Sequence, residues 1–292
     1  KRRDFSNLVR GKVTSGSNTP RRVSNPLGRF LFNTDNRIGL EIMIDKGIVK
    51  KITNGVCAIG YLSVPLEEYL QNSRSPFFHV IGTGFLVKKT TVITNRHVIE
   101  GLFEKQANYG FPSSQFFISI IVPDGAGSFR NTVRMIRHFA TLEAVDIGFV
   151  EFKIVYEEHF EDIHPLDISN DFDFSLTEEI AVCGYPYGTA MLKKRNQLYR
   201  WGPVIQQGAI SGISPFDGAT NPDEILLDVR TAGGMSGAPI FKPLTGEVIG
   251  IHYAGWEATT ALGLPLKNQM VDLWLEEYYE KLDKANLDSG AS

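Results

Sequence analysis

Short apolar segments separated by turns occupy most of the chain between residues 54 and 255. They are rich in Val, Ile and Phe, which favour β-strands, and polar or glycine-containing turns separate them. The first series of predicted strands comprises 55–64, 77–87, 90–95, 116–125, 132–139 and 146–155. The second series comprises 179–186, 202–213, 224–229, 238–243 and 247–255. Two series of about six short strands predict two small antiparallel β-barrels.

The two ends of the chain have a different character. Residues 1–29 contain eight Lys or Arg side chains and one acid, Asp4, so we expect a flexible or surface-draped arm. The segment 37–52 is ambiguous between helix and strand. Near the other end, apolar residues recur every four positions, which predicts one apolar stripe on a helix. These residues are Leu266, Met270, Trp274, Tyr278 and Leu282.

These patterns divide the chain into three parts. Residues 1–53 form an N-terminal basic arm and extension, residues 54–165 the first barrel, and residues 166–292 the second barrel with a C-terminal helix. A chain of 292 residues is long enough to bury a full core. We therefore expect an all-β fold of two six-stranded antiparallel β-barrels with a C-terminal α-helix and an N-terminal extension.

The amino-acid composition limits the classes of molecule that this chain is expected to bind. The chain is 42% hydrophobic and 22% charged, as is ordinary for a globular protein. A net charge of −3 gives no electrostatic drive to bind nucleic acid or anionic lipid. No run reaches the roughly 18 apolar residues of a membrane span. A basic arm can contact nucleic acid, but this one has few aromatic residues, so we expect neither a nucleic-acid nor a membrane partner.

The cysteines, the sequence motifs and the N-terminus indicate which cofactors and which cellular location to expect. Cys57 and Cys183 make neither a disulfide framework nor a paired metal-ligand spacing. No Walker, Rossmann or EF-hand motif occurs, so we expect no metal or cofactor. Free thiols fit a reducing compartment, and no apolar segment of a signal peptide follows the basic N-terminus, so we expect a cytoplasmic location. Because the chain does not begin with Met, we expect it to be processed or part of a larger protein.

Three short segments contain residues suited to nucleophilic catalysis. His97 follows a predicted strand in TTVITNRHVI, Asp146 precedes one in AVDIGFVEF, and Ser236 lies between glycines in RTAGGMSGAPIF. Each residue alone has an ordinary structural explanation. Together they follow one another at intervals of 49 and 90 positions, two in the first barrel and one in the second. Because serine needs a base, and the base needs a carboxylate to fix its tautomer, a cleft between the barrels could assemble a triad.

The segments TNRHVI, VDIGFVEF and GGMSGAPIF resemble the three signatures of trypsin-like (chymotrypsin-fold) serine proteases, over residues 54–284. The resemblance implies a serine endopeptidase that cleaves a polypeptide substrate through an acyl-enzyme. By it, His97 is the general base, Asp146 orients the imidazole and Ser236 is the nucleophile. The N–H groups of Gly234 and Ser236 would form the oxyanion hole.

The closest motifs are those of glutamyl endopeptidases, which read GIHWGG after the nucleophile and carry Thr five residues before it. This chain has GIHYAG, with His252, and Thr231 in the matching position. The resemblance implies a pocket for Glu or Gln before the scissile bond, and both stay open because picornavirus-type cysteine proteases bind Gln with a similar pair. His252 has an alternative role as a core histidine. Arg230 would favour an acidic substrate side chain only if its own side chain points into the pocket. The backbone of Tyr253 to Gly255 would pair with the substrate backbone as an added strand.

One position departs from the pattern of the family. Met235 stands where digestive members carry an Asp that pairs with a new N-terminus, so we expect no activation by N-terminal insertion.

Two alternative functions stay open. A catalytically silent module that binds peptides or proteins is one alternative. The other is the protease domain of a larger regulated assembly, such as a viral polyprotein or a bacterial defence or stress system, which the basic arm and the missing Met motivate.

Overall fold

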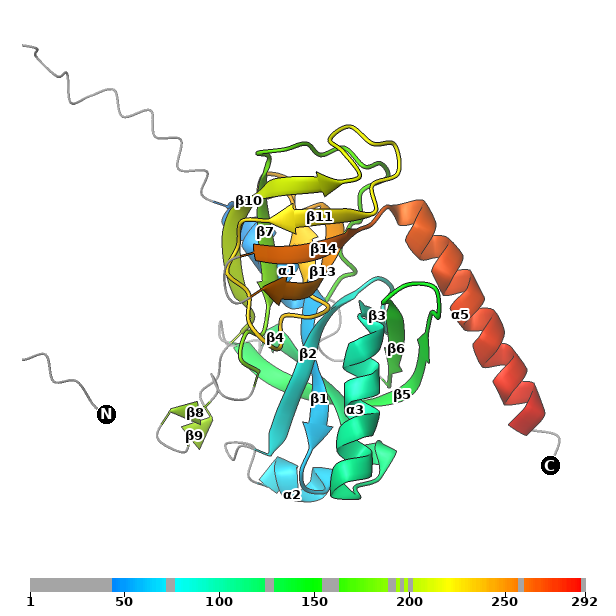
Figure 1. Cartoon of the computed structure of the whole chain (residues 1–292). Coiled ribbons are helices and arrows are strands. Elements are labelled where there is room, and N and C mark those ends of the chain that lie inside the picture. Colours follow the sequence, from blue (N-terminus) through cyan, green and yellow to red (C-terminus); the bar gives the residue numbers. More distant parts are fainter. Residues whose placement is uncertain are drawn as a thin grey trace, which may run out of the picture. The chain divides into compact units, whose positions relative to one another are not determined.

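The computed structural model describes residues 44–71, 77–123, 129–153, 163–188, 193–194, 197–198, 202–256 and 260–289. The predicted basic arm lies outside the described residues. The described part of the chain contains two closed barrels of six antiparallel strands each (Figure 1). The predicted fold class is therefore confirmed.

The first barrel closes in the strand order β1-β2-β3-β6-β5-β4. Its strands are β1 (Val56–Leu62), β2 (Phe78–Leu86), β3 (Thr91–Thr94), β4 (Phe116–Pro123), β5 (Phe129–Thr141) and β6 (Gly148–Phe152). Each falls within or overlaps a predicted segment. Helix α3 (Arg96–Tyr109) follows β3, and the sequence analysis did not predict a helix of this length. Its buried residues Val98, Ile99 and Leu102 share one apolar cluster with side chains from all six strands.

The second barrel closes in the order β10-β11-β14-β13-β12-β7. Its strands are β7 (Glu179–Gly184), β10 (Val204–Ser214), β11 (Glu224–Leu227), β12 (Pro239–Phe241), β13 (Val248–Trp256) and β14 (Thr260–Pro265). The sequence analysis missed β14, because TALGLP has few β-branched residues. Between β7 and β10 lies a two-stranded ribbon, β8 (Lys193–Lys194) with β9 (Gln197–Leu198).

The remaining helices are α1 (Lys46–Gly55), α2 (Leu66–Gln71), the 3₁₀ turn η1 (Ser113–Gln115) and α5 (Asn268–Ser289). Residues 46–52 of the ambiguous segment 37–52 are thus helical, and residues 37–43 lie outside the described residues. Helix α5 begins after Leu266, the first residue of the predicted stripe. Within the helix, Tyr278 of the stripe is buried, and Trp274 and Leu282 pack against the buried core. The buried residues Val271 and Leu275 lie outside the predicted stripe, because an α-helix turns by 3.6 residues and a strict spacing of four drifts about 40° per step.

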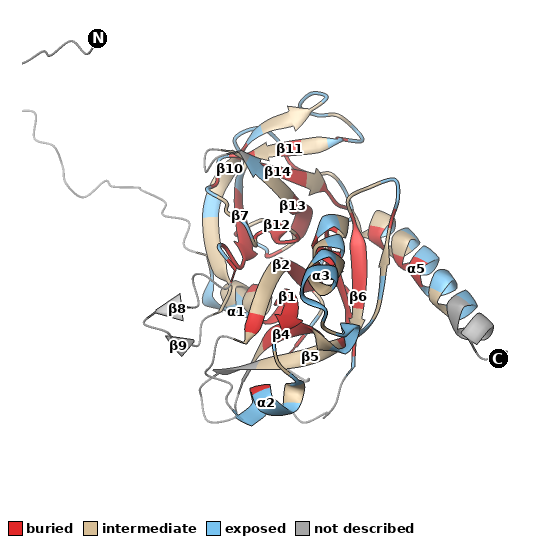
Figure 2. Ribbon diagram, turned by 60° about the horizontal axis from the view of Figure 1, so that its bottom comes forward, coloured by how far each residue is buried: buried red, intermediate tan, exposed pale blue. Residues whose placement is uncertain are grey.

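A layer of buried apolar side chains joins the two barrels. It includes Phe85 of the first barrel, Phe241 of the second, Ile52 of α1 and Tyr278 of α5, each at most 2% exposed. In Figure 2 the buried residues lie mainly in the strands, and the exposed ones lie along the helices and loops. Burial of this shared layer gives a hydrophobic driving force that holds the barrels together.

Some features are absent from the described part of the chain. None of its helices is long and apolar enough to cross a membrane. In the same residues, no three His, Cys, Asp or Glu side chains lie close enough to hold a metal ion. Cys57 and Cys183 are free thiols without exposed surface, and burial raises the pKa of both, so neither is suited to act as a nucleophile.

Helix α5 packs on the first barrel through Tyr278, whose ring centroid lies 5.8 Å from that of Phe149. Its buried hydroxyl has no hydrogen-bond partner among the residues that the structure describes. We predict that Tyr278→Phe leaves the free energy of unfolding unchanged or raises it by up to about 1 kcal/mol, because it removes an unpaired buried polar group. Tyr278→Ala should lower it by about 3–5 kcal/mol. Urea unfolding measures both, and a loss in Tyr278→Phe larger than about 1 kcal/mol would contradict the unpaired hydroxyl.

Candidate active site

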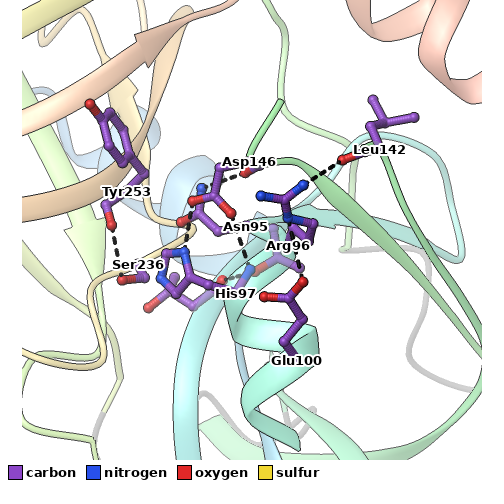
Figure 3. Close-up of polar contacts among 10 residues, drawn as sticks. Asn95, Arg96, His97, Glu100, Leu142, Asp146, Ser236 and Tyr253 are labelled. Carbon is purple, nitrogen blue, oxygen red and sulfur yellow. Dashed lines mark hydrogen bonds and ion pairs between the residues drawn. The ribbon is translucent and has the colours of Figure 1, made fainter. Parts of the chain in front are cut away.

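The imidazole of His97 is paired with the carboxylate of Asp146. Strand β3 ends at Thr94 and α3 begins at Arg96, which places His97 in the first turn of the helix. The His97 N–H donates to Asp146 Oδ1 over 3.1 Å, and Nδ1 lies 2.7 Å from Oδ2 (Figure 3). When Nδ1–H donates to the carboxylate, Nε2 is left as an acceptor, which is the tautomer that a general base requires.

Two residues next to His97 hold the loop that carries Asp146. The amide of Asn95, which is fully buried, donates to the Asp146 carbonyl over 3.0 Å. The guanidinium of Arg96 donates to the Glu143 carbonyl over 2.9 Å. Sequence reasoning did not assign either role, although both residues stand inside the segment TNRHVI. These contacts fix the carboxylate relative to the imidazole.

Ser236 reaches the first barrel from the loop between β11 and β12, residues 228–238, which we call the nucleophile loop. The Thr83 N–H of β2 donates to the Ser236 carbonyl over 2.8 Å. A Cβ on Gly82 would lie 3.1 Å from that carbonyl oxygen and 2.6 Å from Val98, the residue after His97. The folded chain therefore brings the serine beside the helix that carries the imidazole.

The hydroxyl of Ser236 does not point at the imidazole in this structure. It donates to the Tyr253 carbonyl over 3.4 Å, and it makes no hydrogen bond to His97 (Figure 3). Nucleophile–base hydrogen bonds are often long or poorly aligned when no substrate is bound. A rotation about χ1 of Ser236 would redirect the hydroxyl without any change of the backbone.

Next to the Ser236 side chain, backbone N–H groups of the nucleophile loop alternate between bonded and free. The N–H groups of Met235 and Gly237 donate to backbone carbonyls over 3.1 and 2.8 Å. Those of Gly234 and Ser236 have no hydrogen-bond partner among the described residues. Free N–H groups beside a nucleophile are suited to stabilise a developing oxyanion, and these are the two that the sequence analysis predicted.

Apolar packing anchors this loop. Met235 has no exposed surface and belongs to the apolar cluster of the second barrel. Gly234 and Gly237 have φ angles of +97° and +88°, a left-handed region that glycine adopts without steric cost. The loop is therefore held by burial and by glycine geometry.

His252 lies in β13 with 3% of its surface exposed, and within the described part of the chain neither ring nitrogen has a hydrogen-bond partner. The pKa of His252 is lowered to about 4, mainly by burial and also by the nearby charge of His97. The backbone of Met235 and Ala254 opposes this shift but offers no well-aligned hydrogen bond. The ring is therefore neutral at physiological pH, with one N–H donor and one acceptor nitrogen.

The other predicted pocket residues lie around this strand. A Cβ on Gly255 would lie 2.4 Å from the Thr231 hydroxyl, so Thr231 packs against the end of β13. Arg230 is exposed, and no described contact assigns it to a pocket. Strand β12 pairs with β13 only as far as Ile251, so in the described chain no strand covers that side of Tyr253 and Gly255. An extended peptide could pair with this edge.

Residues 82–251 match the family model of the trypsin-like peptidase domain. The chain belongs to this family. It is 26% identical over 252 residues to a glutamyl endopeptidase of Staphylococcus aureus (strain MRSA252), covering 84% of this chain and 60% of that protein. A glutamyl endopeptidase of Staphylococcus epidermidis is 26% identical over 208 residues, covering 68% of this chain and 59% of that protein. The chain thus spans about three fifths of the length of these relatives.

Solved structures show the same fold. A crystal structure of Rv3671c from M. tuberculosis H37Rv, a serine-to-alanine mutant in an inactive form, superposes with a TM-score of 0.50 at 15% identity. The match covers 80% of this chain and 91% of that one. The expected resemblance to trypsin-like proteases is confirmed, and the residue assignments within this trypsin-like domain stay predictions.

Two glycines of the nucleophile loop allow a direct test of its described backbone conformation. A Cβ on Gly237 would lie 1.9 Å from the Thr83 carbonyl oxygen, whereas one on Gly233 would meet open space. We predict that Gly237→Ala lowers the free energy of unfolding by at least about 1–3 kcal/mol, from the left-handed backbone alone. Gly233→Ala should change it by less than about 0.5 kcal/mol. Urea denaturation compares the two, and equal stabilities would contradict the described loop.

Proposed function

We propose that this chain is a serine endopeptidase that uses Ser236 as nucleophile, His97 as general base and Asp146 to orient the base. The observation that carries the proposal is the paired His97–Asp146 side chains beside Ser236, with the N–H groups of Gly234 and Ser236 unpaired among the described residues. The membership of the chain in the trypsin-like peptidase family supports the same chemistry. The substrate is accordingly a polypeptide.

The reaction follows from these positions. The Ser236 hydroxyl turns from the Tyr253 carbonyl and attacks the scissile carbonyl carbon, while Nε2 of His97 takes its proton. The carbonyl oxygen becomes an anion that accepts hydrogen bonds from the N–H groups of Gly234 and Ser236. The C–N bond breaks, the amine leaves with the proton from His97, and an acyl-enzyme remains. Water then attacks the ester, its proton passes through His97 to the departing serine oxygen, and a carboxylic acid is released.

We further propose that the residue before the scissile bond is Glu or Gln. The relatives named glutamyl endopeptidase support this proposal. The unpaired ring nitrogens of His252 and the hydroxyl of Thr231 support it chemically, because both groups can donate to an oxygen. The exposed position of Arg230 gives no support for its part in the pocket. The expected cytoplasmic location and the larger assembly stay predictions.

The triad assignment is tested by two substitutions. We predict that Ser236→Ala abolishes both peptide cleavage and labelling by a fluorophosphonate, because the attacking oxygen is lost. Asp146→Asn should lower kcat about 10⁴-fold, since the carboxamide favours the wrong imidazole tautomer.

Steady-state kinetics and gel-based labelling measure these effects, with Asp272→Asn on α5 as a control that should keep full activity. A wild-type protein that binds peptide as tightly as Ser236→Ala and neither cleaves nor labels would instead indicate a silent binding module.

The pocket assignment predicts a pH-dependent preference. A neutral His252 suits the Gln amide, whereas a protonated one suits the Glu carboxylate. We predict that the ratio of kcat/KM for Glu over Gln peptides rises about 10-fold or more as the pH falls from about 8 to about 5.5. Because the same triad would cleave both peptides, the effect of its own titration cancels in this ratio. His252→Gln should make the ratio independent of pH.

Cleavage profiling of a peptide library completes this test. Enrichment of Lys, Arg or Leu before the cut would refute the pocket assignment while leaving the triad intact.

A further inference from the structure

Thr83 joins the two barrels at the nucleophile loop, and its hydroxyl bridges two backbone groups of the second barrel. The side chain, which has no exposed surface, donates to the Gly234 carbonyl over 2.7 Å and accepts from the Tyr185 N–H over 3.1 Å. We propose that Thr83 is a positioning residue that sets the oxyanion hole. The proposal rests on the proposed serine endopeptidase activity.

The direction of both hydrogen bonds is fixed. A backbone carbonyl can only accept and a backbone N–H can only donate, so the single hydroxyl proton of Thr83 must point to Gly234. Because the peptide unit is planar and trans, the N–H of Met235 then points the opposite way, where it donates to the Ala232 carbonyl over 3.1 Å. Two opposed hydrogen bonds therefore prevent this peptide from rotating.

This peptide lies between the two free N–H groups. It is preceded by the N–H of Gly234 and followed by that of Ser236. Thr83 also holds the far side of Ser236, whose carbonyl accepts from the Thr83 N–H over 2.8 Å. Both predicted oxyanion donors therefore adjoin a carbonyl that Thr83 holds. If the Gly234 carbonyl were released, the peptide could rotate and turn a donor away from the substrate oxygen.

Neighbouring contacts hold Thr83 and its hydrogen-bond partners in position. The space where a Cβ of Gly234 would lie is filled by the Tyr185 carbonyl oxygen, 2.3 Å away. Tyr185 is thus packed against the same glycine that Thr83 binds. On the other side, the Thr94 hydroxyl donates to the Thr83 carbonyl over 2.7 Å, and Thr94 ends the strand that leads to His97. One buried side chain thus links the oxyanion donors to the element that positions the base.

Three variants separate this role from general packing. Thr83→Val keeps the shape of the side chain and removes the hydroxyl, and Thr83→Ser keeps the hydroxyl. Thr91→Val is the matched control, because Thr91 is equally buried and its hydroxyl bonds Tyr279 of α5 over 2.8 Å, away from the nucleophile loop. Each variant is assayed for kcat and KM on a Glu or Gln peptide, and for inhibition by the corresponding peptide aldehyde, whose tetrahedral adduct places an oxygen in the oxyanion hole.

A second set of variants, which lack the Ser236 hydroxyl, measures peptide binding separately from cleavage. Each threonine variant is combined with Ser236→Ala, and the Kd of the uncleaved peptide is measured. We expect Thr83→Val to lower kcat roughly 10-fold to 100-fold and to weaken the aldehyde by a similar factor. KM, and Kd in the Ser236→Ala background, should stay within about 2-fold because peptide binding does not use the oxyanion donors. Thr83→Ser should restore activity, and Thr91→Val should match the wild type.

Several results would overturn the proposal. These are a kcat of Thr83→Val within about 2-fold of wild type, an equal loss of peptide binding in the Ser236→Ala background, or the same kinetic loss in Thr91→Val. If Thr83→Val does not fold by circular dichroism, Thr83→Ala is measured with the same expectation. A wild-type protein without turnover or fluorophosphonate labelling would refute the proposed endopeptidase, whereas an active wild type with an unaffected Thr83→Val would refute only this role.

Discussion

A hydrogen bond of 2.8 Å from the Thr83 N–H to the Ser236 carbonyl holds a loop of one barrel against a strand of the other. The site depends on this contact, because the imidazole and the serine come from different barrels. The contact in turn requires close approach of two backbones. Gly237 has only hydrogen where a Cβ would lie 1.9 Å from the Thr83 carbonyl oxygen. The apolar layer shared by both barrels supplies the burial that keeps them together.

In the proposed mechanism, each barrel contributes a different part of the chemistry. The first presents His97 paired with Asp146, and Asn95 and Arg96 hold the loop of Asp146. The second presents Ser236 and the N–H groups of Gly234 and Ser236. Met235 packs in the apolar core where digestive members of the family place an Asp, so hydrophobic burial anchors this loop. A site preorganised by buried contacts needs little reorganisation when charge develops on the substrate oxygen.

The proposed pocket chemistry depends on one buried side chain. His252 lies on the strand whose backbone pairs with the nucleophile loop, and neither ring nitrogen has a partner in the described residues. An unpaired buried polar group is costly to the folded protein, and a ligand that supplies a hydrogen bond removes that cost. A substrate side chain with an amide or carboxylate would do so. The same burial lowers the pKa of the imidazole, so in the proposed pocket the choice between amide and carboxylate would depend on pH.

The sequence by itself determined the strand segments, because β-branched and aromatic residues recur locally, and it located His97, Asp146 and Ser236 within recognisable motifs. It did not determine the length of α3, the strand β14 or the burial of Val271 and Leu275 on α5, since each depends on packing against distant residues. The role predicted for Arg230 depended on a side-chain direction that the sequence could not fix. The bridge made by Thr83 joins residues 151 positions apart. Only the tertiary structure decides such a contact, because its hydrogen bonds run to backbone groups, which every residue type carries and no sequence pattern marks.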